Sequence, residues 1–233
     1  MNPVRECLQH AVEKGIFPGA VLLVGVKDRT VLLEAYGKAR LHPSQRPMTI
    51  NTVFDLASLT KPLATTLSVM ILVQNGVIGL DQKLGAIISD FARTEKKDIT
   101  VRRLLSHASG LGAYRPYYQT LKDLGREQAR TALRRELLEE PLTYEPGKSC
   151  LYSDLGFMIL HWAIEAVTGQ RLNEHVCRAV YEPFGLDMLF FNPLSDCKKA
   201  SYVATEDCPW RGKVLEGEVH DDNAYAVGGV AGH

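Results

Sequence analysis

The arrangement best suited to chemistry in this sequence is a serine followed three residues later by a lysine, at Ser58 and Lys61. If the segment is helical, this spacing places both side chains on one face, a turn apart. A serine hydroxyl is a weak nucleophile until a base takes its proton, and a lysine in a desolvated site near a helix N-terminus can take it. The pair predicts a nucleophilic Ser58 with Lys61 as its base.

The same spacing occurs a second time, at Ser195 and Lys198, so the pattern alone is not specific. The residues after Ser58 are apolar nearly all round, which predicts a buried helix that ends at Gly76. The stretch around Ser195 is polar and irregular, and we interpret that match as accidental. The alternative for the first match is an N-cap Ser58 beside a solvated Lys61.

A second candidate element is Tyr152-Ser153-Asp154, which precedes a predicted amphipathic helix over 154–167. A tyrosine at this point can place its phenol in a cleft, and a phenolate held by an ammonium can act as a general base. Asp154 is expected to cap the helix. The alternative for Tyr152 is a core tyrosine with one polar partner for its hydroxyl.

Other kinds of site are disfavoured. The seven histidines include no His-Glu-x-x-His and no ligand cluster, so no metal ion and no cofactor is expected. His107 is expected to organise its loop by hydrogen bonds, and the polar run 220–223 to form a loop at a cleft rim. The sequence contains no Gly-x-Ser-x-Gly elbow and no P-loop, which argues against an α/β-hydrolase and a phosphate-cradling loop.

Charge and composition limit the classes of binding partner and the cell compartment that we expect. Lysine plus arginine and aspartate plus glutamate are both 27, so the chain lacks the basic excess of nucleic-acid-binding or polybasic membrane-surface proteins. No apolar run of about 18 residues predicts a membrane span. Five irregularly spaced cysteines favour free thiols in a reducing compartment. We expect a cytoplasmic protein, or a periplasmic one where an export signal has been removed.

The elements that must position these residues fall into two parts. A helix is predicted over 3–14, followed by a hairpin of strands 19–26 and 30–36. Later helices are predicted over 99–105, 126–140, 154–167 and 173–181, with Thr100 and Asn173 as N-caps of the first and last. The expectation is a single domain over 1–233, in which 1–57 supply a helix and the first hairpin of a sheet and 58–233 are mostly helical.

Four segments occur in an order and spacing that resemble the serine β-lactamase and penicillin-binding-protein superfamily. They are Phe54-x-x-Ala-Ser58-Leu-Thr-Lys61, Leu104-Leu-Ser-His107-x-Ser-Gly-Leu111, Tyr144-Glu-Pro-Gly147 and Tyr152-Ser-Asp154-x-Gly-Phe. Within the superfamily they resemble the class C β-lactamase branch, which includes carboxylesterases and D-alanyl-D-alanine peptidases. The resemblance runs from about residue 10 to the end of the sequence.

This resemblance implies an α+β fold of the β-lactamase/transpeptidase type, with an antiparallel sheet flanked by helices and joined to a helical domain. It implies a serine hydrolase in which Ser58 forms an acyl-enzyme, while Lys61 and Tyr152 share the proton transfers. The substrate would be a small molecule or a peptide: a β-lactam, a short-chain ester or a D-amino-acid peptide. Asp154 would contact it, and Tyr114, which lies close to Tyr117 and Tyr118, either lines its wall or belongs to a packed loop.

Two departures from the family pattern bear on activity. Asp154 stands where the family usually has asparagine, and an ionised carboxylate cannot donate a hydrogen bond to a substrate carbonyl. No Lys-Thr-Gly or His-Thr-Gly third motif occurs, so the sequence resembles the N-terminal portion of such a protein, with the later sheet strands missing. The alternative function is a catalytically incomplete fragment or a peptidoglycan-peptide-binding module, able to self-associate through an exposed sheet edge.

Overall fold

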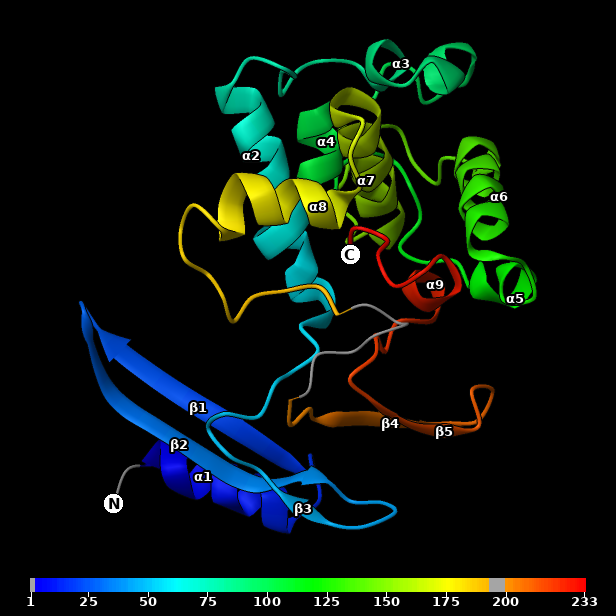
Figure 1. Ribbon diagram of the computed structural model, residues 1–233. Coiled ribbons are helices and arrows are strands. Elements are labelled where there is room, and N and C mark those ends of the chain that lie inside the picture. Colours follow the sequence, from blue (N-terminus) through cyan, green and yellow to red (C-terminus); the bar gives the residue numbers. More distant parts are fainter. Residues whose placement is uncertain (1–2, 193–199) are drawn as a thin grey trace. The chain divides into compact units, whose positions relative to one another are not determined.

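The computed structural model describes residues 3–192 and 200–233, and the chain divides into two compact units (Figure 1). Unit 1 consists of Met1–Asp55 and Asn192–His220, and unit 2 of Leu56–Phe191 and Asp221–His233. The first break lies close to the expected boundary at residue 57. The segment 192–220, which the sequence pattern assigned to the helical part, clusters with the N-terminal residues instead.

Unit 1 begins with the predicted helix and hairpin. Helix α1 (Pro3–Glu13) precedes strands β1 (Gly19–Val26) and β2 (Arg29–Arg40), which pair antiparallel, with Ala20 opposite Tyr36. The short strand β3 (Arg46–Pro47) joins the other side of β2, giving the order β1-β2-β3. Gly37 has φ of 68°, and a Cβ there would stand 2.3 Å from the Pro18 carbonyl oxygen, so only glycine fits.

A second hairpin in unit 1 has no counterpart in the sequence prediction, which found no strong strand candidate after residue 60. Strands β4 (Ala204–Cys208) and β5 (Lys213–Glu216) pair antiparallel. Their sequences are short and partly charged, so their own pattern is weak. Long-range ion pairs hold the hairpin in place, because Glu216 lies 3.0 Å from Arg40 Nη1 and 2.5 Å from Arg46 Nη1.

Unit 2 is built from helices that surround one buried helix. Helix α7 (Asp154–Thr168) is its centre, since Leu155 through Leu160 and Trp162 through Ile164 are all buried. The other elements in chain order are η1 (Ala57–Leu59), η2 (Lys61–Thr66), α2 (Leu67–Gln74), α3 (Leu84–Ile87), η3 (Ser89–Arg93), α4 (Val101–Leu105), α5 (Tyr118–Leu121), α6 (Arg126–Glu139), α8 (Leu172–Val176), η4 (Cys177–Tyr181) and α9 (Asp222–Ala226).

The helix caps test the local predictions. Thr100 caps α4 as expected, by accepting a hydrogen bond from the Arg103 backbone N–H. The prediction for α7 is wrong: Ser153 is the N-cap and accepts from Gly156 N, whereas Asp154 is already helical. The prediction of Asn173 is also wrong, because α8 begins one residue earlier and Arg171 is its N-cap.

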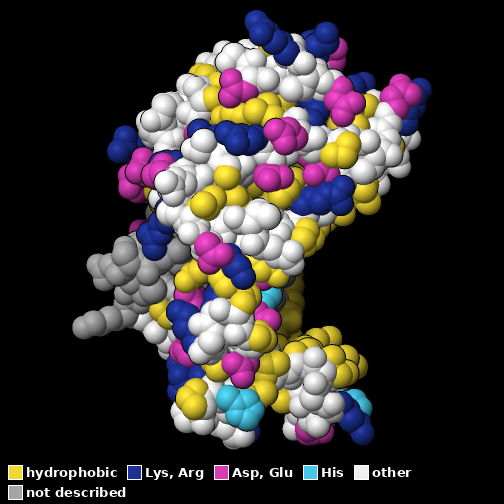
Figure 2. Space-filling view, turned by 90° about the vertical axis from the view of Figure 1, so that its right-hand side faces the viewer, with side chains coloured by type: hydrophobic (Ala, Val, Ile, Leu, Met, Phe, Trp, Pro, Cys, Tyr) yellow, Lys and Arg dark blue, Asp and Glu magenta, His cyan; other side chains and the backbone are white. Residues whose placement is uncertain are grey.

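The surface shows no separation of charge by sign on the side where α5 and α6 lie. Basic and acidic side chains are interspersed there, with apolar patches between them (Figure 2). This agrees with the zero net charge of the chain. Among the described residues, no helix is both long enough and apolar enough to cross a membrane.

Candidate active site

The backbone around Ser58 is irregular in a way that exposes its side chain. Ser58 is in the middle of the 3₁₀ turn η1 and is exposed, and the preceding Ala57 has φ of 45°. The left-handed region costs a residue with a Cβ about 1–2 kcal/mol, so the surrounding fold must hold Ala57 there. The next element, η2, has π-helical bonding from Lys61 and includes Pro62, which has no N–H.

Lys61 links the candidate nucleophile to Asp154. Its Nζ lies 3.1 Å from Ser58 Oγ and 2.7 Å from Asp154 Oδ1. Only 3% of Lys61 is exposed, so its ammonium group needs a countercharge, and Asp154 supplies it. The structure therefore brings together three of the five residues singled out in the sequence.

Tyr152 is placed next to this group by its ring rather than by its hydroxyl. The Lys61 nitrogen lies 4.8 Å from the centroid of the Tyr152 ring, a distance typical of cation–π contacts. Tyr152 is 52% exposed. In the part of the chain that the structure describes, its hydroxyl makes no hydrogen bond to Ser58 or Lys61, so the phenol is within reach of the site without being engaged in it.

His107 positions the segment that contains Tyr152, whereas the sequence predicted only that it organises its own loop. Its Nδ1 accepts a hydrogen bond from Ser153 N at 3.0 Å, and its carbonyl accepts one from Leu151 N. Its ring packs against those of Tyr152 and Phe157, at centroid distances of 4.6 and 5.2 Å. Burial lowers the pKa of His107, and the nearby Lys61 charge lowers it further. A neutral His107 thus holds the Tyr152 segment, beyond the loop it was expected to organise.

Backbone and neighbouring side-chain hydrogen bonds hold Asp154 in place. Its N–H donates to the Ala113 carbonyl at 2.9 Å, and the hydroxyl of the preceding Ser153 donates to the Gly112 carbonyl at 2.7 Å. Asp154 also lies in the first turn of α7, where the helix dipole favours a negative charge. The position of the carboxylate beside Lys61 is therefore set by the loop at 112–113 and by the start of α7.

The tyrosine loop divides into a packed part and an exposed part. Tyr117 is buried, and its hydroxyl donates to Glu140, which also accepts from Arg115. Tyr114 follows Ala113 directly and is 44% exposed. Burial raises the pKa of Tyr114, and the charge of Asp221 raises it further. Tyr114 directly follows the residue whose carbonyl accepts from Asp154 N, whereas Tyr117 is structural.

The start of α9 closes against this loop. The amide of Asn223, which is fully buried, accepts from Tyr118 N and donates to the Arg115 carbonyl, both at 2.8 Å. Asp221, expected in a loop, is the N-cap of α9 and accepts from Ala224 N. The described residues include no group of three or more histidine, cysteine, aspartate or glutamate side chains that could hold a metal ion. The second serine–lysine match, Ser195 and Lys198, lies outside the described residues.

Residues 4–231 match the family model described as Beta-lactamase. The chain belongs to the β-lactamase family. The resemblance seen in the sequence is thereby confirmed, and Ser58, Lys61, Tyr152 and Asp154 lie within the matched range.

Comparisons with known proteins agree with this assignment. The chain is 32% identical over 260 residues to a Bacillus subtilis (strain 168) protein named "N-acetylmuramyl-L-alanine amidase", covering 100% of this chain and 58% of that protein. It is 30% identical over 260 residues to an Escherichia coli (strain K12) protein named "Putative D-alanyl-D-alanine carboxypeptidase", covering 100% and 59%. The chain therefore spans about three-fifths of the length of these curated relatives.

A solved structure confirms the fold. The octameric penicillin-binding protein homologue from Pyrococcus abyssi superposes with a TM-score of 0.77 at 20% identity, covering 99% of this chain and 52% of the other. At that identity the likeness speaks for the fold alone. The expected α+β fold of the β-lactamase/transpeptidase type is thus confirmed for this β-lactamase-family chain.

Proposed function

We propose that this chain carries the nucleophile of a serine hydrolase that forms an acyl-enzyme on an ester or amide carbonyl. The observation that carries the proposal is the position of the Lys61 nitrogen, which is buried and within hydrogen-bond distance of both Ser58 Oγ and Asp154 Oδ1. A nucleophile, a nitrogen base and a group that orients the base form the arrangement that nucleophilic catalysis needs.

In the proposed reaction, Ser58 Oγ attacks the carbonyl carbon and its proton passes to Lys61 in the amine form. The tetrahedral intermediate then collapses, the bond to the leaving group breaks, and the leaving alcohol or amine takes up a proton. Tyr152 packs its ring against the Lys61 nitrogen, so we assign it the transfer of that proton toward the leaving group. Water attacks the acyl-enzyme in a second cycle of the same transfers and releases the acid.

Asp154 has a different task in this scheme from that of an asparagine. Its carboxylate holds Lys61 in place, at 2.7 Å, and balances the charge of the ammonium form. Because it has no proton to donate, it cannot bind a substrate carbonyl oxygen. It can accept a hydrogen bond from a substrate N–H, and Tyr114 would form the exposed wall beside it.

For the substrate class we propose a peptide of the kind found in the bacterial cell wall. The support lies in two relatives, one named as an amidase of N-acetylmuramyl-L-alanine and the other as a D-alanyl-D-alanine carboxypeptidase. An activated ester or a penicillin would act as a surrogate, because either presents a reactive carbonyl to Ser58.

A second candidate is a module that binds such a peptide without turning it over. The sequence contains no Lys-Thr-Gly or His-Thr-Gly, and the chain spans about three-fifths of its relatives. In addition, β1 is an edge strand of its sheet, and Leu23 on it is 60% exposed. Self-association through this strand is part of the second candidate.

The deciding experiment is intact-protein mass spectrometry after exposure to p-nitrophenyl acetate and to benzylpenicillin. Acyl-enzyme chemistry predicts a mass increase of one acyl group in the wild type and none in Ser58→Ala. Ser195→Ala, which removes the serine of the other serine–lysine match, serves as the matched control and should label like the wild type. Equal labelling of Ser58→Ala and wild type would contradict the assignment, and an adduct that is never released would favour the second candidate.

A further inference from the structure

A small hollow in unit 2 is not part of the Ser58 site. It has a volume of about 30 Å³ and lies between α6, α7 and the segment that follows α9. None of Ser58, Lys61 and Asp154 lines it. One part of its wall is apolar and includes Leu133 and Leu137, and the other part carries Arg130, Arg134, His161 and Glu165.

Basic charge at this hollow exceeds acidic charge. Arg130 and Arg134 are four residues apart on α6, where like charges repel each other. Arg171 is a third guanidinium, bonded to Glu127 and 3.7 Å from Glu165. These three arginines face two carboxylates, and Glu127 is 75% exposed, where pairing is weak. Burial lowers the pKa of Arg130 and the charge of Arg171 lowers it further, in keeping with an incompletely balanced cation.

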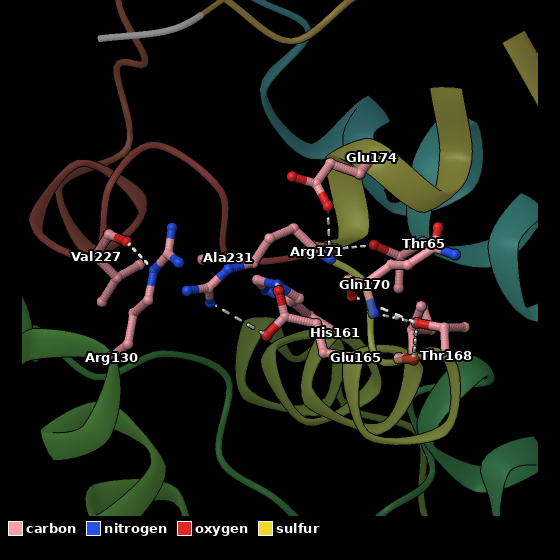
Figure 3. A network of polar contacts seen from close by, with 12 residues as sticks. Thr65, Arg130, His161, Glu165, Thr168, Gln170, Arg171, Glu174, Val227 and Ala231 are labelled. Atoms are coloured by element: carbon pink, nitrogen blue, oxygen red, sulfur yellow. Dashed lines mark hydrogen bonds and ion pairs between the residues drawn. The ribbon is translucent and has the colours of Figure 1, made fainter. Parts of the chain in front are cut away.

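Each oxygen of Glu165 has a hydrogen-bond donor, whereas the guanidinium of Arg130 keeps a nitrogen without an acceptor among the described residues. Glu165 accepts from His161 Nε2 at 3.0 Å and from Arg134 Nη2 at 2.9 Å. Figure 3 shows Arg130 bonded to Val227 rather than to Glu165. Arg130 makes no bond to Glu165. Its Nε donates to the Val227 carbonyl at 2.7 Å, and its Nη1 lies 3.4 Å from Glu127. Within the described residues its Nη2 has no acceptor.

The glycine at position 228 keeps this nitrogen accessible. A Cβ on Gly228 would stand 3.1 Å from Arg130 Nη2, and Gly228 has φ of 102°, which disfavours any side chain there. Arg134 likewise uses one nitrogen for Glu165 while its guanidinium packs on the Trp162 ring. Two guanidinium groups therefore have hydrogen-bond donors to offer beside an apolar wall.

We propose that this hollow binds a small carboxylate with a short apolar chain. The two carboxylate oxygens accept from Arg130 and Arg134, and the chain lies against Leu133 and Leu137. The planar guanidinium group of arginine matches the geometry of a carboxylate. Hydrogen bonds between these two charged groups are stronger than those between neutral groups. A phosphate would turn further charged oxygens toward the apolar side chains and leave them without donors. The volume admits a group of a few heavy atoms.

The test is isothermal titration calorimetry of the full chain with butyrate, with its neutral isostere butyramide, and with inorganic phosphate. We expect saturable butyrate binding at one site in the millimolar range, at least about tenfold weaker binding of butyramide, and no stronger binding of phosphate. Because this comparison uses only the wild-type chain, it does not depend on how any variant folds.

A pair of variants on α6 locates the site. Arg130→Gln should weaken butyrate binding about tenfold, since it removes the charge while retaining a donor for Val227. Arg135→Gln changes an exposed arginine on the same helix and should bind like the wild type. The proposal is overturned by equal binding of butyrate and butyramide, by undiminished binding in Arg130→Gln, or by the absence of saturable butyrate binding. Labelling of Ser58 is independent of all three results.

Discussion

Helix α7 carries a partly buried carboxylate near each of its ends, and the two carboxylates are stabilised differently. Asp154 lies in the first turn, where the helix dipole favours a negative charge, and its ion-pair partner is Lys61 at 2.7 Å. Glu165 lies in the last turn, where the dipole disfavours a negative charge. It is surrounded by three basic side chains, those of His161, Arg134 and Arg171.

The difference shows which of the two ion clusters is able to do chemistry. Burial would raise the pKa of Glu165, but the hydrogen bond from His161 and the charges of His161, Arg171 and Arg134 outweigh it and lower the pKa to about 2. His161 and Arg134 donate hydrogen bonds to the Glu165 carboxylate, and Arg171 lies 3.7 Å from it. At the other end of α7, Asp154 has a single ion-pair partner among the described residues, Lys61. The Lys61 nitrogen also lies 3.1 Å from the hydroxyl oxygen of Ser58. Because Asp154 has only this one ion-pair partner in the described part of the chain, the Lys61 nitrogen can contact both the carboxylate and the Ser58 nucleophile.

The largest expected effect comes from Lys61→Met, which removes the nitrogen base and keeps the apolar stem. We expect the rate of Ser58 acylation by p-nitrophenyl acetate to fall about 10³-fold, within the range of general-base contributions. Lys122→Met changes an exposed lysine and is the matched control, with an unchanged rate. An acylation rate of Lys61→Met within a factor of three of wild type, roughly the scatter of such measurements, would remove Lys61 from the mechanism.

The second effect is on folding, and comes from Asp154→Ala. The Lys61 side chain is 4% exposed, so removing its partner leaves an uncompensated buried charge. We expect the free energy of unfolding to fall by about 3–5 kcal/mol, measured by urea denaturation. Asp154→Asn should recover only part of that loss, because its amide oxygen still accepts from Lys61 but supplies no countercharge. Asp123→Ala at an exposed position should be neutral, and an equally neutral Asp154→Ala would show that the pair is not buried in solution.

At the other end of α7, Glu165→Gln should destabilise the chain without changing acylation. Because the folded-state pKa of Glu165 is lowered, its stabilisation is fully present above the unfolded value of 4.5 and is lost as the pH falls toward about 2. We expect a loss of about 2 kcal/mol at pH 7 and a shallower decline in stability between those two pH values. Parallel stability curves for the variant and the wild type would contradict this assignment of Glu165.

The parts of the molecule that the sequence predicts are those set by local pattern or motif. Amphipathic periodicity predicts α1 and α6, and two apolar β-type runs separated by a polar turn predict the first hairpin. The serine–lysine spacing indicates Ser58 and Lys61. The second hairpin is missed because its strands depend on Glu216, whose arginine partners lie some 170 positions earlier in the chain. The contact of His107 with Tyr152 is missed for the same reason, since it joins two loops whose approach no local pattern encodes.

The smallest effect on stability is expected from Ser153→Ala, at the residue that caps α7 in place of the predicted Asp154. Its hydroxyl accepts from Gly156 N and donates to the Gly112 carbonyl. Loss of an N-cap costs about 1 kcal/mol, and the buried Gly112 carbonyl would lose its donor. Ser153→Thr keeps the hydroxyl and should restore stability in part.

The rate of Ser58 acylation shows whether Ser153 only caps α7 or also positions Asp154. If the hydroxyl also anchors the loop at 112–113, which binds Asp154 N through Ala113, then Ser153→Ala should slow labelling of Ser58 in addition to lowering stability. We expect a three- to tenfold slower rate, roughly what a 1 kcal/mol displacement of Asp154 and Lys61 produces. A variant that is less stable but labels at the wild-type rate would show that Lys61 alone places Asp154, and would make the contrast between the two ends of α7 a matter of charge rather than of loop geometry.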